Sequence, residues 1–231
     1  MNNNSFITLE CTGVGSSNFL QSQLTCNIKD LEENSPQLTA CCNLQGRVIF
    51  TATINKHQET YSLIIPASMK DIVINHLEKY AKFSKCALRY IDLAGATGWS
   101  PSSNILNGIP TIYPETSEKI IPQRLNLHLI PGAMSFKKGC YLGQEIIARL
   151  HFKGQLKHHM YLGEISENAI TYGEDITDAE QKITGIVIDF FTENHKTIFL
   201  FVNEIENTTP FIGQQKITLL PLPYSIEETS A

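Results

Sequence analysis

A single cysteine, Cys140, lies in the stretch SFKKGCYLGQEIIARLHFKG among residues that can tune its chemistry. Lys137 and Lys138 precede it and apolar residues at helical spacing follow it, so we expect Cys140 in the first turn of a docked helix. Unpaired N–H groups, the helix dipole and the two ammonium groups would favour a thiolate there. Gly139 permits another molecule to approach closely. The pattern predicts a reactive thiol, and these residues alone leave a simple packing role for Cys140 as the alternative.

The nearby histidines do not indicate a cysteine–histidine hydrolase. In a continuous helix His151 would lie roughly 16 Å along the axis from Cys140, too far to activate its sulfur. A more distant histidine would be needed, and no nucleophile signature accompanies the cysteine. His158 and His159 follow Lys157 and are expected on the surface rather than in a metal site. We predict no set of metal ligands.

Length and charge restrict the function further. The chain has 231 residues, 42% of them hydrophobic, and a formal net charge of −5, which argues against nucleic-acid binding by bulk electrostatics. The first residues, MNNNSFITLE, do not read as a secretory signal, and no apolar run reaches the ~18 residues that span a bilayer. A cytoplasmic location is the default expectation. There the other cysteines should be reduced and mainly structural, namely Cys11, Cys26, Cys41, Cys42 and Cys86.

The elements that must position the cysteine fall into two expected domains, residues 1–152 and 153–231. The first should be an α+β domain with helices on one face of an antiparallel sheet. Between the two parts, 94–123 is rich in glycine and proline, predicts an irregular segment and contains the one tryptophan, Trp99. The second should be a small β-barrel. We expect helices from Gly15 to about Ile28 and over Ala67–Phe83, and strands over Phe6–Cys11, Leu38–Leu44, Arg47–Ile54, Tyr61–Ile65, Lys85–Leu93, Tyr161–Ile165, Lys182–Phe191, Thr197–Ile205 and Lys216–Leu220.

Several motifs resemble one family over nearly the whole chain. KKGCYLGQE is similar to the K-G-C-Y-x-G-Q-E signature of the YgfZ family, folate-binding relatives of the glycine-cleavage aminomethyltransferase. FLQSQLT, CCNLQGRV, GIPTIYPE with IPQRLNL, HFKGQLK and PLPYSIEE resemble further family segments. The resemblance implies an aminomethyltransferase-like N-terminal domain followed by a C-terminal β-barrel. Longer relatives carry an additional stretch between the strand ending near Leu93 and the GIP segment, so here the first domain is expected to be abbreviated.

The resemblance also implies a function and a site. It implies a factor that maintains iron–sulfur enzymes, linked to tetrahydrofolate, which supports tRNA modification through the [4Fe–4S] enzymes that perform it. Cys140 would be the working residue, as a nucleophile or a transient cluster ligand, and Lys138 would hold its thiolate or meet an anion. Its partners would be folate and iron–sulfur enzymes or cluster carriers, without direct nucleic-acid or membrane binding. The residues implied for the folate site are Phe6, Trp99, Tyr141, Gln144 and Glu145.

Two other functions remain open on the sequence. One is a folate-dependent aminomethyl transferase, in which catalysis relies on a carboxylate near the folate; no acidic residue stands at a diagnostic position. The other is a non-catalytic module that binds RNA or protein, and the acidic net charge weighs against RNA. An accessory factor is the favoured interpretation.

Overall fold

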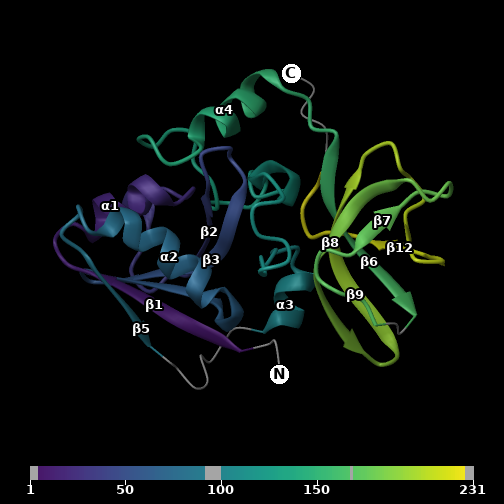
Figure 1. Cartoon of the computed structure of the whole chain (residues 1–231), viewed down its shortest axis with the longest axis horizontal. Helices are drawn as coiled ribbons and strands as arrows, with labels where there is room; N and C mark the ends of the chain where they lie inside the picture. The colour runs from purple at the N-terminus through teal and green to yellow at the C-terminus, as the bar shows by residue number, and fades with distance from the viewer. Residues whose placement is uncertain (1–4, 92–99, 167–168, 227–231) are drawn as a thin grey trace.

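The computed structural model describes residues 5–91, 100–166 and 169–226. Two antiparallel sheets stand side by side, with helices around the first and an irregular segment between them (Figure 1). This arrangement confirms the predicted α+β fold followed by a β-barrel.

The first sheet has five strands in the order β2-β3-β4-β1-β5. Every neighbouring pair is antiparallel, and the β2–β3 hairpin turns through Gln45 and Gly46. A register shift between Cys41 and Cys42 keeps both side chains buried. The strands are β1 (Phe6–Thr12), β2 (Gln37–Cys42), β3 (Val48–His57), β4 (Thr60–Pro66) and β5 (Ala87–Ile91).

Helices α1 and α2 lie on one face of this sheet (Figure 1). The amphipathic pattern over Ala67–Phe83 is confirmed, because α2 turns Val73, Leu77 and Ala81 into the core. Within the described ranges no helix combines the length and hydrophobicity that a bilayer-spanning segment requires. The helical elements are α1 (Ser16–Gln23), η1 (Ile28–Asp30), η2 (Ala67–Met69), α2 (Lys70–Ala81), α3 (Pro101–Leu106), η3 (Pro122–Leu125) and α4 (Gln144–Lys153).

Helix α1 is shorter than predicted, since it ends at Gln23 rather than near Ile28. Leu24 leaves the helix to form a bridge with Cys41 of β2. The next residue, Thr25, is fully buried, and its hydroxyl donates to the carbonyl of Ala133 at 2.7 Å and accepts from a β2 amide. These contacts join residues far apart in sequence, and they override the local helical spacing.

The irregular segment after residue 100 bridges the two sheets. At one end, the Thr51 hydroxyl of β3 donates to the Pro110 carbonyl at 3.0 Å and accepts from an amide of the segment. At the other end, buried Asn126 donates its side-chain amide to the Met160 carbonyl of the second sheet at 2.7 Å. The described part of the predicted irregular link starts with the short helix α3 and is packed on both sheets, while 94–99 lie outside the described residues.

The second sheet has the strand order β11-β10-β7-β8-β9-β6-β12. Its two outer strands are separated in the chain by one residue, Ile217, so the sheet must curl into a nearly closed barrel. The strands are β6 (His158–Ser166), β7 (Asp175–Thr177), β8 (Ile183–Glu193), β9 (Lys196–Glu204), β10 (Phe211–Ile212), β11 (Gln215–Lys216) and β12 (Thr218–Leu220).

Strands β6, β8 and β9 are buried on both faces. Phe199, Phe201 and Val187 fill the barrel interior. On the opposite face, Met160 and Leu200 belong to the same buried cluster as the first sheet. The two parts of the chain therefore share one continuous core, and the expected boundary between residues 152 and 153 falls at the end of α4.

Candidate functional site

Cys140 lies in an extended loop before α4, not in the first turn of a helix, so that prediction is wrong. The helix begins at Gln144, after Gly143, whose φ of 77° places it in the left-handed region. A side chain at Gly143 would meet the carbonyl oxygen of Asn43, because the loop is pressed against the β2–β3 turn. This local geometry interrupts helical structure between Cys140 and Gln144.

The thiol of Cys140 is therefore presented by a loop. Cys140 is the exposed member of six free cysteines, all of which lie in the described ranges. Without a helical turn at this position, the argument from the helix dipole no longer applies to its sulfur. A thiolate at Cys140 stays a prediction, and what the structure adds is that the sulfur is accessible.

Lys138 points into the protein. Its ammonium group donates to the carbonyls of Leu24 and Cys26 at 2.5 and 2.7 Å, and it lies 5.0 Å from the centre of the Tyr141 ring. Burial lowers the pKa of Lys138 to about 8, and the nearby Cys26 thiol partly opposes this change. These contacts fasten the cysteine loop to the end of α1, and the predicted role of Lys138 beside a thiolate is not tested by them.

Tyr141 and Gln144 hold the other side of the loop. Tyr141 is buried, burial raises the pKa of its hydroxyl, and within the described ranges that hydroxyl has no hydrogen-bond partner. The backbone N–H of Tyr141 donates to the Gln144 side chain at 3.2 Å, and the N–H of Leu142 donates to the Ser22 carbonyl at 3.1 Å. Glu145 is exposed on the first turn of α4.

A pair of stacked rings anchors the start of the loop. Phe136 stacks on His151 of α4, with ring centres 3.8 Å apart and planes 7° apart, and Phe152 lies against both rings. No continuous helix joins Cys140 to His151, because α4 begins at Gln144, so the separation expected along a helix axis does not apply. The His151 ring is instead engaged with Phe136. Anchored on both sides, the loop holds Cys140 toward solvent.

The described residues predicted for folate come from two parts of the chain. Phe6 starts β1 and pairs with Pro66 of β4. Tyr141 lies in the cysteine loop, and Gln144 and Glu145 start α4, which lies at the top in Figure 1. Trp99 lies outside the described residues. The assignment of these residues to a folate site therefore stays a prediction.

A buried polar cluster around Asp189 and Tyr113 was not predicted from the sequence. Asp189 of β8 is fully buried, and burial raises the pKa of its carboxyl to about 8, an effect partly offset by Thr111 and by the Phe190 N–H. Tyr113 stacks on Tyr172 with ring centres 3.9 Å apart. Within the described ranges, Asp189 Oδ2 and the Tyr113 hydroxyl lack hydrogen-bond partners. An aspartate inside the apolar run IVIDFF was the signal that could have revealed this site.

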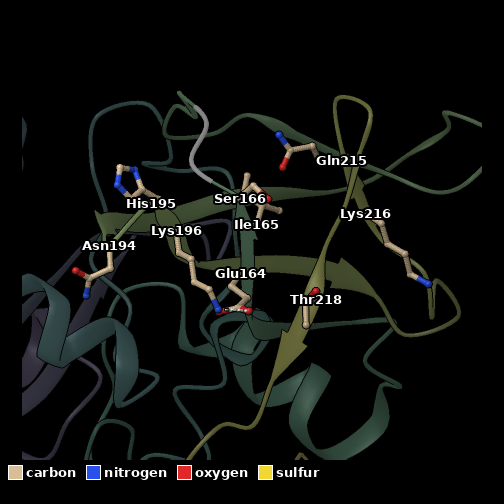
Figure 2. A pocket seen from close by; sticks show the side chains of 9 residues that line it. All are labelled: Glu164, Ile165, Ser166, Asn194, His195, Lys196, Gln215, Lys216 and Thr218. Atoms are coloured by element: carbon tan, nitrogen blue, oxygen red, sulfur yellow. Dashed lines mark hydrogen bonds and ion pairs between the residues drawn. The ribbon is translucent and has the colours of Figure 1, made fainter.

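A pocket of about 520 Å³ lies on the barrel (Figure 2). The side chains of Lys196 and Glu164 point toward each other there and are paired at 2.9 and 3.0 Å. Glu164 thus matches the charge of Lys196, and none of the predicted site residues that the structure describes lines this pocket. The candidate site therefore remains the exposed cysteine loop.

Comparisons with known proteins identify relatives over most of the chain. No family model matches the chain. An uncharacterized protein of Haemophilus influenzae is 27% identical over 95% of this chain and 96% of its own length. The tRNA-modifying protein YgfZ of Buchnera aphidicola is 30% identical over 65% of this chain and 68% of its own length. The tRNA-modifying protein YgfZ of Cronobacter sakazakii is 25% identical over 94% of this chain and 90% of its own length.

A solved structure shows the same fold. The glycine cleavage system aminomethyltransferase T of Bartonella henselae superposes with a TM-score of 0.70 over 93% of this chain and 82% of that protein, at 13% identity. The predicted aminomethyltransferase-like fold is thereby confirmed.

The relatives also contain residues that this chain lacks. The Cronobacter alignment extends over 297 positions, whereas this chain has 231 residues, so at least 66 of those positions have no counterpart here. A shortened chain was expected, and the place of the shortening stays a prediction.

Proposed function

The chain belongs to the YgfZ family, and we propose on that basis that it is a cytoplasmic accessory factor that supports tRNA modification, with Cys140 as its working residue. The observation that carries the proposal is the presentation of the motif. Lys138, Tyr141 and Gln144 are engaged inside the protein, while Cys140 is left exposed. A loop built only for packing would have no need to hold its thiol in solvent.

We further propose that the thiol acts on iron–sulfur enzymes. A thiolate is a soft ligand that suits iron–sulfur clusters, and it is also the nucleophilic form of cysteine. In the described part of the chain, no group of three or more histidine, cysteine or acidic side chains is placed to hold a metal ion. A cluster at Cys140 would therefore need ligands from a second protein, which suits transient contact rather than a resident cofactor.

Folate is a separate part of the proposal. The aminomethyltransferase fold and the family resemblance support binding of a reduced folate. The residues named for a folate site stay a prediction, so we assign folate no step. Titration with tetrahydrofolate, followed by the emission of Trp99 and by the melting temperature, tests this part, and an unchanged melting temperature at millimolar tetrahydrofolate would remove folate from the account.

Complementation tests the proposed function. Expression of this chain in bacteria that lack their own YgfZ protein should restore the modified nucleosides of tRNA that [4Fe–4S] enzymes produce. The nucleosides are measured by mass spectrometry of digested tRNA. Unchanged nucleoside levels, with the chain present in folded form, would contradict the proposal.

A further inference from the structure

The stretch around the cysteine is basic in an acidic protein. Residues 135–158 contain five of the 18 lysines and arginines and one of the 23 acidic residues. The remaining chain thus has 13 basic and 22 acidic residues. Three of the five basic side chains, Lys137, Arg149 and Lys153, are exposed close to the cysteine loop or on α4.

The exposed arc of α4 combines this charge with apolar side chains. At 100° per residue, Phe152, Arg149, Lys153 and Ile146 occupy one continuous arc opposite buried Ile147, with Glu145 inside it. Phe152 is 67% exposed and Ile146 is 44% exposed, so two large apolar side chains of the same arc face solvent.

The β2–β3 turn extends the apolar part of this arc. Gly46 lies so close to α4 that an added Cβ would stand 3.2 Å from the side chain of Ile146. Leu44, two residues earlier, is 67% exposed. We call Leu44, Ile146, Arg149, Phe152 and Lys153 the α4 face.

The α4 face carries two cations, Arg149 and Lys153. Arg149 and Lys153 form no salt bridge with any described residue. A surface that exposes large apolar groups together with unpaired cations is typical of a binding surface rather than of a solvated helix.

We propose that the α4 face docks an acidic protein surface, that of the iron–sulfur protein on which Cys140 acts. Arg149 and Lys153, in the middle of the arc, complement acidic side chains, and the apolar side chains that flank them fit apolar groups of a protein surface. RNA would match the charge but would leave the two aliphatic side chains without an apolar partner. This inference rests on the proposed function for the kind of partner, and it names the surface by which that partner is held.

Binding measurements with matched variants test the docking. The probe is a purified, fluorescently labelled [4Fe–4S] tRNA-modifying enzyme, and its affinity is measured by anisotropy at low and physiological salt. The test variants are Phe152→Ala and the double change Arg149→Glu with Lys153→Glu. The control variants are Phe83→Ala and the double change Lys82→Glu with Lys85→Glu. These residues lie on the loop between α2 and β5, and Phe83 is 89% exposed.

The expected result is a loss of about tenfold or more in affinity for each test variant, with the controls unchanged. Added salt should weaken wild-type binding more than that of the charge-reversed variant. Circular dichroism and melting temperatures establish that all variants are folded.

Several outcomes would overturn the docking surface. The enzyme could fail to bind, or the test and control variants could lose equal affinity. The protein could instead bind tRNA in a way that the test substitutions abolish, or it could self-associate through the α4 face. The Cys140→Ser variant keeps these outcomes separate from the proposed function. This variant should bind the enzyme normally and yet fail in complementation. Full complementation by Cys140→Ser would contradict the proposed function. Normal binding by the α4-face variants would contradict only the docking surface.

Discussion

The buried carboxyl of Asp189 should make the stability of this protein fall as pH rises. Burial raises the pKa of Asp189 from an ordinary value of 3.8 to about 8, so the folded state retains a proton that the unfolded state releases above pH 4. Because the unfolded state binds fewer protons between these values, the free energy of unfolding decreases with pH across that window. Below about pH 4 both states are protonated and the contribution is constant.

The magnitude follows from the proton difference. One retained proton changes the free energy of unfolding by ~1.4 kcal/mol per pH unit, so raising the pH from 5 to 7 should cost up to ~2.7 kcal/mol. Asp189→Asn keeps the size of the side chain and removes the titration. Relative to this variant, the wild type should lose that stability between pH 5 and 7.

Urea denaturation at pH 5, 6 and 7 measures the difference between the two proteins. Asp175→Asn, at an exposed position of β7, is the matched control and should follow the wild-type slope. Equal pH slopes for the wild type and Asp189→Asn would refute the reasoning, since they would show that Asp189 titrates alike in both states.

Two substitutions and one alkylation experiment test the cysteine loop. Gly143→Ala should destabilise the protein by about 1–3 kcal/mol, seen in urea denaturation, because alanine resists a φ of 77° and meets the Asn43 carbonyl. Lys138→Met should cost about 1–3 kcal/mol in the same assay, because it leaves two carbonyls without their donor; no loss would contradict the clamp. Iodoacetamide should alkylate Cys140 first among the six cysteines, as read by mass spectrometry. Burial raises the pKa of Cys11 to about 12 and also raises the pKa of Cys86, whereas Cys140 is exposed, so faster labelling of Cys86 would contradict this order.

Much of the fold was predictable because its determinants are local. Alternating and β-branched runs predicted the longer strands but not β7 or β10, and the spacing of Val73 and Leu77 predicted α2. The end of α1 was not predictable, since Thr25 is held by contacts with residues 40 and 133, which no local pattern reports.

The site was predictable in its residues more than in its geometry. The motif singled out Cys140, but the helical pattern was extended four residues too far because the left-handed conformation of Gly143 depends on the packing of the β2–β3 turn. The inward direction of Lys138 likewise depends on carbonyls more than a hundred residues earlier. Asp189 carries a local signal, an acid within an apolar strand, and that signal was overlooked.

The most direct test of the central claim is the level of [4Fe–4S]-dependent modified nucleosides in tRNA from cells that express Cys140→Ser in place of the wild-type chain. Cys86→Ser, a half-buried thiol outside the motif, is the control, and the amount of each folded variant is measured in parallel. The account predicts that Cys86→Ser restores the nucleosides and that Cys140→Ser, although equally abundant, does not. Full restoration by Cys140→Ser would contradict the assignment of Cys140 as the working residue.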